Sequence, residues 1–163
     1  MFENRVDDLI SFDSSTFLPG NIDTARLRGG ELTVATAIAG WELQGQYSHV
    51  DPRNRSAGPS HGKLLPRRAR DTARLDLDRG FGALAFGATL GAAGRRYDDA
   101  ATQVRVGGHA TVDLRLEYTV HPDWTLQARV TNLFDQDYQL MDWYNQPGRG
   151  FGLNLRWRPA GRR

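Results

Sequence analysis

Five arginines close together in one polar stretch are the residues best placed to bind another molecule. A guanidinium group holds phosphates and carboxylates through paired, charge-assisted hydrogen bonds. The surrounding stretch is rich in proline, glycine and serine, which predicts a surface loop. Two interpretations are open: contact with an anionic ligand or lipid phosphate, and a loop that is only solvated. The arginines are Arg53, Arg55, Arg67, Arg68 and Arg70.

Other combinations of residues lack the spacing that a cofactor or metal requires. Residues 80–85 have the glycine spacing of a dinucleotide-binding loop, but no helix is predicted to follow, so a tight turn explains them better. Asp98 and Asp99 could bind calcium, although a solvated acidic loop is the commoner use of such a pair. No nucleophile, base and oxyanion donor occur together, so we expect no catalytic residue, cofactor, metal site or enzymatic activity. The histidines are too far apart to share a zinc ion: His49, His61, His109 and His121.

Composition narrows the class of protein. A chain of 163 residues predicts one domain, and the lack of cysteine excludes disulfides and thiolate metal sites. The formal net charge of +2 is too small to predict nucleic-acid binding. The mean hydropathy is −0.55, and no apolar run approaches the roughly 18 residues of a membrane helix. A membrane barrel also has low mean hydropathy, because half of each strand faces a polar lumen.

The clearest structural signal is strict alternation of apolar and polar residues in the last third of the chain. Residues 110–120 alternate without interruption, and the pattern returns in residues 124–131 and 151–157. A period of two places the apolar and polar sets on opposite faces of a β-strand. These segments predict three strands of a sheet with one apolar and one polar face.

The whole chain predicts an all-β fold, an antiparallel meander of about eight strands with no helix. Short and long connections alternate along it, so all long connections fall at one end of the sheet, as in outer-membrane barrels. The expected strands are residues 2–12, 26–38, 41–49, 72–78, 83–97, 110–120, 124–131 and 151–157. The expected long connections are residues 13–24, 50–68, 97–107 and 135–149.

Two architectures differ in what the apolar face packs against. A soluble β-sandwich would bury that face against a second sheet, whereas a transmembrane barrel would turn it to lipid. Two features favour lipid. Charges of both signs are dense on the polar faces, as in Asp113, Arg115 and Glu117. Aromatic residues gather at strand ends, where interfacial girdles belong: Trp41, Tyr47, Tyr118, Trp124, Phe134 and Trp157. A soluble sandwich and a self-contained eight-stranded barrel are the alternatives.

One C-terminal pattern resembles a known family. An Asn-Leu-Phe-Asp-x-x-Tyr segment begins at Asn132 and ends at Tyr138. It is followed by Pro-Gly-Arg at residues 147–149 and by the amphipathic strand 151–157. This order resembles the C-terminal signature of TonB-dependent outer-membrane receptors. The resemblance implies a place in the outer membrane of a Gram-negative bacterium, in a barrel of twenty-two strands around an N-terminal plug.

Within this family the chain is most similar to the receptors for cobalamin (vitamin B12). Residues 64–70, 94–98, 106–108 and 143–149 carry the narrower likeness. It implies ligand contacts at Arg67, in a Pro-Arg-Arg motif, and at Tyr144, before Asn-Gln-Pro-Gly-Arg. A third such position, a tyrosine, falls near Ala101 and is absent. A siderophore-type receptor of the same family is the alternative.

The resemblance further implies that residues 1–163 form the C-terminal part of the receptor barrel. The plug domain and the signal peptide are expected to be absent, since residues 1–8 have no basic and apolar regions of a leader. Expected partners are cobalamin or another ligand of the family, outer-membrane lipid and lipopolysaccharide, the plug and remaining strands, and the barrel assembly machinery. TonB would be reached only through the missing N-terminal part.

Overall fold

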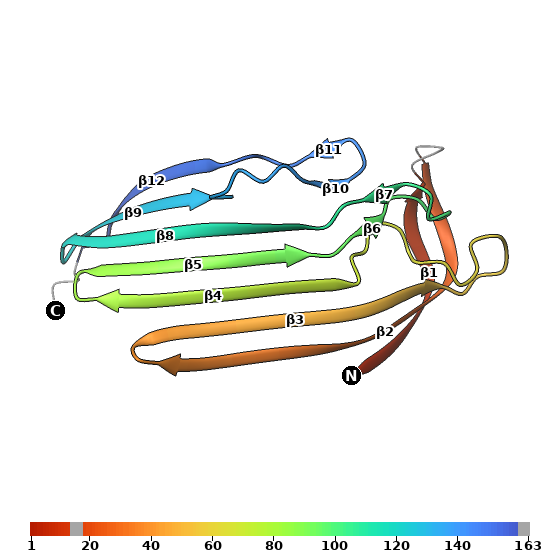
Figure 1. Ribbon diagram of the computed structural model, residues 1–163, viewed down its shortest axis with the longest axis horizontal. Coiled ribbons are helices and arrows are strands. Elements are labelled where there is room, and N and C mark those ends of the chain that lie inside the picture. Colours follow the sequence, from red (N-terminus) through yellow and green to blue (C-terminus); the bar gives the residue numbers. More distant parts are fainter. Residues whose placement is uncertain (14–17, 160–163) are drawn as a thin grey trace.

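Eight antiparallel strands follow one another in chain order across a single sheet in the computed structural model, which describes residues 1–13 and 18–159 (Figure 1). Two short hairpins lie in its connections: β6 (Arg96–Tyr97) with β7 (Arg105–Val106), and β10 (Gln139–Met141) with β11 (Tyr144–Asn145). The predicted all-β meander is thereby confirmed. The eight strands are β1 (Phe2–Asp13), β2 (Leu18–Ile38), β3 (Trp41–Asn54), β4 (Asp71–Phe81), β5 (Leu84–Ala93), β8 (His109–His121), β9 (Trp124–Thr131) and β12 (Gly150–Trp157).

The tight turns and the long connections lie at opposite ends of the sheet, as predicted. The turns β2–β3, β4–β5 and β8–β9 are together at the left of Figure 1, and the longer connections are at the right. Ala39 and Gly40 form the first turn with φ of 52° and 80°, the two positive angles that match the twist of a hairpin. In the part of the chain that the structure describes, no helix is long and apolar enough to cross a membrane.

β2 and β3 are much longer than predicted, and β4 ends three residues later than expected. β2 begins at Leu18, so the expected connection 13–24 is wrong over residues 18–24; residues 14–17 lie outside the described residues. The β1–β2 ladder continues to the pair Asp13–Leu18. β3 runs on to Asn54, where a loop was expected from residue 50. Cross-strand pairing thus outweighs the turn preference of proline, glycine and asparagine at these positions.

One predicted strand is divided. The segment expected as 83–97 forms β5 only as far as Ala93, and Arg96 and Tyr97 pair instead with Val106 and Arg105 in the hairpin β6–β7. This hairpin occupies most of the connection that was predicted as a polar loop.

From the second half of β2 to β12, the exposed large apolar residues of the strands lie on the same face of the sheet. Leu32, Leu153 and Phe151 expose 62%, 75% and 79% of their surface there. No second layer covers this face among the described residues. Water against so much apolar surface is unfavourable by about 25 cal/mol per Å², which favours lipid over a soluble sandwich. One row crosses six strands through Leu43, Leu77, Ala88, Leu114, Val130 and Phe151.

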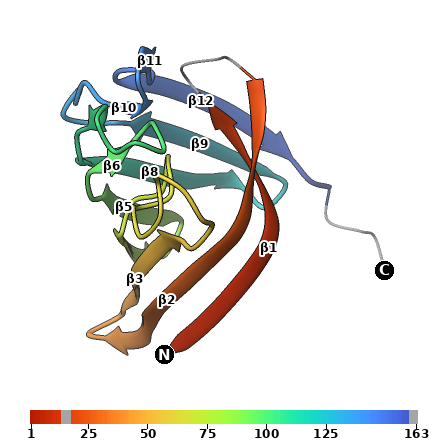
Figure 2. The ribbon, with the colours of Figure 1, turned by 90° about the vertical axis from the view of Figure 1, so that its right-hand side faces the viewer.

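The sheet curls into an open arc with β1 and β12 as its two edges (Figure 2). Within residues 1–13 and 18–159 no ladder joins β1 to β12, as a self-contained eight-stranded barrel would require. The buried apolar core is correspondingly small. It consists of Ile22, Ala25 and Leu65, with Val6 and Leu9 packed against them. The connection between β3 and β4 therefore folds onto β1 and β2 and supplies Leu65.

Candidate functional site

The polar face of the sheet carries an ion-pair network that joins β4, β5 and β8. Arg115 Nη2 donates to Asp78 Oδ1 at 2.8 Å, and Arg74 Nε donates to Asp76 Oδ2 at 2.6 Å. The Thr89 hydroxyl donates to Asp76 at 2.6 Å and accepts a hydrogen bond from Arg115. Most of the charge on this face is therefore paired within the sheet, which ties β4, β5 and β8 together.

A second network continues the polar face toward β12. Gln127 Nε2 donates to Glu117 Oε2 at 2.6 Å, and Asn154 Nδ2 donates to Gln127 Oε1 at 3.1 Å. Arg156 also reaches Glu117, at 3.4 Å. Both networks border a hollow of about 710 Å³. Its lining can hydrogen-bond a polar segment, which an apolar core could not do.

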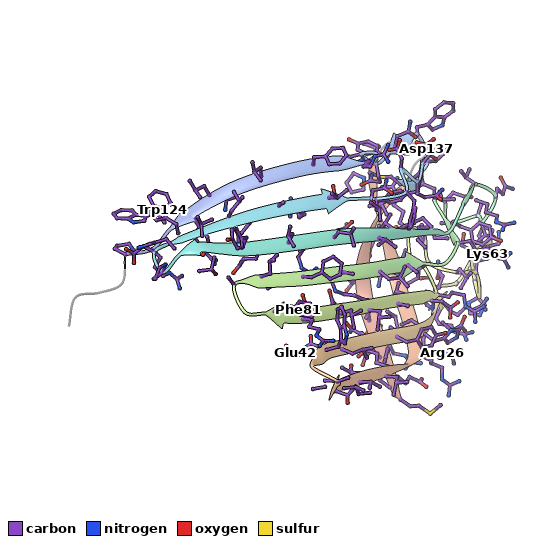
Figure 3. The ribbon with its side chains drawn as sticks, turned by 60° about the vertical axis from the view of Figure 1, so that its left-hand side comes forward. Arg26, Glu42, Lys63, Phe81, Trp124 and Asp137 are labelled. Atoms are coloured by element: carbon purple, nitrogen blue, oxygen red, sulfur yellow. The ribbon has the colours of Figure 1, made fainter. Side chains whose placement is uncertain are left out.

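At the end of the sheet that carries the long connections, which we call the loop end, an ion pair joins two of these connections. Lys63 marks this end and Phe81 the tight-turn end in Figure 3. Arg67 Nε and Nη2 donate to the two carboxylate oxygens of Asp98 at 2.8 and 3.2 Å. The Arg67 amide also donates to Tyr97 O at 2.6 Å, and Lys63 Nζ donates to Ala101 O at 3.2 Å. The connection 55–70 is thereby fastened to the hairpin β6–β7.

The expected site residue Arg67 is thus engaged within the protein. Its side chain is 30% exposed, while the Asp98 side chain is only 3% exposed. Sequence analysis weighed Asp98 only as a calcium ligand and missed this role. The sequence does contain two adjacent arginines, at 67 and 68, and two adjacent aspartates, at 98 and 99. It does not show which arginine contacts which aspartate.

Of the other four members of the arginine cluster, two lie beside Asp51, Arg55 is partly buried, and Arg68 is exposed. Arg53 Nε lies 3.0 Å from Asp51 Oδ1, and Arg70 Nη2 lies 3.4 Å from the same oxygen. Arg68 is exposed in the connection. The cluster is therefore partly neutralised by Asp51.

The second expected site residue, Tyr144, is arranged differently. It lies in β11, on another connection from Arg67, and 61% of its surface is exposed. The preceding Trp143 has φ of 62° and is 90% exposed. Two exposed aromatic rings therefore lie at the tip of the β10–β11 hairpin.

The residues of the motif that begins at Asn132 form the base of the connection 132–150. Asn132 is 5% exposed and has φ of 49°. Its side chain accepts from the Gln136 amide and donates to Gln136 O, both at 2.9 Å, and its own amide donates to Asp113 Oδ1 at 2.9 Å. The Arg149 amide donates to Asp135 Oδ1 at 2.6 Å. The motif therefore joins the start and end of the 132–150 connection to the sheet.

A buried cation lies in β6, at the start of the third long connection. Arg96 is 9% exposed, and its Nε and Nη2 atoms have no hydrogen-bond partner among the described residues. Burial lowers the pKa of its guanidinium. Nearby, the rings of His109 and Tyr138 stack at 4.1 Å. Sequence analysis did not single out Arg96, because nothing in the pattern distinguishes it from the exposed Arg95.

The acidic pair does not gather further metal ligands in the structure. Asp99 accepts from the amides of Gln103 and Val104 at 2.9 and 2.8 Å, which closes the turn of that loop. Over the described ranges, no three histidine, cysteine, aspartate or glutamate side chains meet in a group that could hold a metal ion.

Aromatic side chains form a belt at the tight-turn end. Trp41 lies edge-on to Phe81, with ring centroids 6.3 Å apart, and the Arg79 guanidinium lies 4.6 Å from the Phe81 ring. The Trp124 and Trp157 rings are 6.1 Å apart on neighbouring strands. Figure 3 shows Phe81 and Trp124 at this end. Such a belt is typical of a membrane interface.

Solved structures share this fold. The siderophore receptor PiuA from Acinetobacter baumannii matches with a TM-score of 0.74 and 20% identity over 94% of this chain and 24% of its own. The ferric preacinetobactin receptor BauA from the same organism has a TM-score of 0.75 and 21% identity over 95% of this chain and 26% of its own. The copper transporter OprC has a TM-score of 0.74 and 22% identity over 95% and 27%. The chain thus spans about a quarter of the length of these structures.

A sequence model of a protein family shows which family the chain belongs to. The model described as "TonB dependent receptor-like, beta-barrel" matches residues 1–133, which is most of the chain. Members of this family are outer-membrane transport proteins of Gram-negative bacteria and not enzymes. The chain belongs to the TonB-dependent receptor-like β-barrel family.

Proposed function

We propose that this chain is the C-terminal part of the barrel wall of an energised outer-membrane uptake receptor. One observation carries the proposal: a single open sheet has an apolar outer face, a charged inner face and every long connection at one end. In such a receptor the long connections face outward and meet the ligand. The charged inner face would pack against the plug.

The complete receptor would contain more than these eight strands. Its plug and remaining strands would come from sequence outside residues 1–163, and the edges β1 and β12 would pair with neighbouring barrel strands. TonB would act on the part that carries the plug. The chain would supply part of the barrel wall and the external loops, and β12 would be the strand that the assembly machinery recognises.

Cobalamin is the ligand that we propose first. The support is the set of motifs at residues 64–70, 94–98, 106–108 and 143–149, together with the exposure of Tyr144 at the hairpin tip. A ferric siderophore or another metal complex is the second candidate, because the solved relatives are described as receptors for siderophores and as a copper transporter. Tyr144 and Arg67 are the proposed contacts in either case.

A binding comparison tests the ligand. The receptor that contains this chain would be purified in detergent and titrated with cobalamin and, separately, with ferric siderophores. Replacement of an exposed aromatic contact typically weakens binding by about ten-fold, so we expect that loss for Tyr144→Ala. Tyr118→Ala, at the tight-turn end, is the matched control and should bind normally. Siderophore binding without cobalamin binding would select the second candidate, and binding of neither would refute both.

A second comparison separates ligand contact from loop positioning at Arg67. Arg67→Ala and Asp98→Ala both break the ion pair that fastens the connections. If Arg67 also touches ligand, Arg67→Ala should weaken binding by several-fold more than Asp98→Ala does. Equal losses would assign Arg67 to positioning only.

A further inference from the structure

The last residue of the C-terminal motif makes a different kind of contact from the residues that begin it. Asn132 and Asp135 form the base of the connection through hydrogen bonds, whereas the ring of Tyr138 stacks on the imidazole of His109. The ring centroids are 4.1 Å apart and the ring planes are inclined by 24°. Both residues are half-buried. His109 is the first residue of β8, so the stack joins the connection 132–150 to the sheet.

The stack lies on the polar face of the sheet. His109 is paired with Ala93 in the continuous ladder of β5 and β8. Side chains alternate along a strand, so His109 shares its face with Asp113 and Arg115. Arg115 belongs to the ion-pair network of the inner face. The ring of Tyr138 therefore covers His109 on the inner side of the wall, and the β10–β11 hairpin begins there.

The hairpin that follows Tyr138 is held as a unit by its own hydrogen bonds. Gln139 Nε2 donates to Asn145 Oδ1 at 2.7 Å, and the Gln146 amide donates to Tyr138 O at 3.0 Å. These bonds close the open end of the hairpin beside the stacked ring. A shift of Tyr138 would therefore carry the tip with it, including the exposed Tyr144.

The strand β10 also lies against the hairpin β6–β7. β10 and β7 are in contact, and both are at the loop end in Figure 1. Val106 of β7 is only 4% exposed, so this junction is closed to solvent on the β7 side. The β10–β11 hairpin is thus docked at two places, through the ring stack on β8 and through the contact with β7. The ring stack can be removed by changing one side chain.

We propose that Tyr138 and His109 are positioning residues of the ligand site. Their stacked rings hold the β10–β11 hairpin over the inner side of the wall and so fix where Trp143 and Tyr144 meet the ligand. A mobile hairpin loses conformational freedom when ligand binds, whereas a docked hairpin has already lost it and therefore binds more tightly. The role of Tyr144 rests on the proposed uptake function, but docking of the hairpin can be measured without any ligand.

Spin labels measure docking in the detergent-purified receptor that contains this chain, in a form otherwise free of cysteine. This chain has no cysteine of its own. Labels at Trp143→Cys and Ala100→Cys report the distance between the hairpin tip and the exposed loop of β6–β7. With the stack intact we expect a narrow distribution of distances. Tyr138→Ala and His109→Ala should each broaden it, and Tyr138→Phe, which keeps the ring, should leave it narrow.

Ligand affinity shows whether docking matters for binding. The probes are cyanocobalamin and a ferric siderophore, titrated separately into receptors that keep Trp143. Apparent affinity falls with the fraction of receptor in the competent conformation, and a stacked aromatic pair changes an equilibrium constant by about two- to ten-fold. We therefore expect Tyr138→Ala and His109→Ala each to weaken binding by about five-fold, and Tyr138→Phe to bind normally. The double alanine variant should lose no more than either single variant, because both changes remove the same contact.

Phe134→Ala is the matched control, because Phe134 is an aromatic residue of the same connection that is 74% exposed. It should keep the narrow distribution and normal affinity. If Tyr138→Ala fails to fold, Tyr138→Leu takes its place, since leucine keeps apolar volume without a planar ring.

Several outcomes would overturn the proposal. They are a narrow distribution in Tyr138→Ala, equal broadening in Phe134→Ala, and losses in the double variant that multiply those of the single variants. Affinity of Tyr138→Ala within about two-fold of wild type would also overturn it. If the wild-type receptor binds neither probe, the proposed uptake ligands are wrong, and the distance distributions alone decide whether the stack docks the hairpin.

Discussion

The guanidinium of Arg67 and the carboxylate of Asp98 form a two-point ion pair, with Nε and Nη2 at 2.8 and 3.2 Å from the two oxygens. The two residues are 31 positions apart in the sequence and belong to two different connections of the sheet. Asp98 is almost fully buried, so the pair is shielded from solvent on one side. The connection 55–70 and the hairpin β6–β7 are therefore held together as one unit.

Asp98→Asn should loosen both connections. The change leaves Arg67 without its charge partner, and because Arg67 is partly exposed we expect a loss of about 1–3 kcal/mol in the local stability of the loops. Limited proteolysis and amide hydrogen exchange of residues 55–70 and 94–108 measure it. Asp137→Asn is the control, since Asp137 is exposed on another connection. Equal protection in the two variants would contradict a role for the ion pair.

Asn132→Ala should be the most destabilising change in the C-terminal motif. It removes the side-chain hydrogen bonds to Gln136 and places alanine at a φ of 49°. Two lost buried hydrogen bonds and a left-handed alanine together cost about 2–4 kcal/mol. Thermal unfolding of the receptor in detergent would show the loss. Phe134→Ala, at a ring that is 74% exposed, should change little; a larger effect there would argue that the motif serves a surface contact.

Gly87→Ala should disturb the charged inner face. A Cβ atom at Gly87 would lie 2.8 Å from Arg115 Nη2 and even closer to Asp78, so the ion pair between them must shift. Because the pair is partly exposed, we expect a modest loss of about 1 kcal/mol. Gly91→Ala, on the same face of β5, is the control, since its nearest atom is 3.7 Å away. Unfolding midpoints that fall equally in both variants would show that the ion pair is not the cause.

Arg96→Met should cost no stability, and should raise it by about 1–2 kcal/mol if methionine fills the same space. The guanidinium is buried, burial lowers its pKa, and its Nε and Nη2 atoms lack partners within the described part of the chain. Arg115→Met is the comparison, because that charge is paired with Asp78 and its removal should destabilise. Denaturant unfolding distinguishes the two. A clear loss for Arg96→Met would mean that the charge has a partner in the complete receptor.

The 163-residue chain expressed alone should aggregate or associate edge to edge. Both β1 and β12 present unpaired backbone groups, which are costly in lipid and adhesive in water. Size-exclusion chromatography with light scattering in detergent, and without it, measures the outcome. A monodisperse monomer with cooperative unfolding in the absence of detergent would contradict this expectation and restore the soluble alternative.

Sequence alternation determined the strands and their faces wherever one face had to be apolar throughout. Residues 110–120, 124–131 and 151–157 form strands within one or two residues of the predicted bounds, because every second side chain must meet the same environment. The number of strands, their order and the separation of turns from loops follow from the same pattern. The C-terminal motif correctly indicated the family.

Only the tertiary structure decided where pairing outweighs local preference and which charges meet. The start of β2 at Leu18 and the end of β3 at Asn54 depend on hydrogen bonds from the neighbouring strand. The residue types at 18–24 and 50–54 do not by themselves predict this pairing. The pairing of Arg67 with Asp98, the isolation of Arg96 and the stacking of Tyr138 on His109 depend on contacts between distant segments. Alternation assigns a residue to a face, but only the ladder assigns it a neighbour.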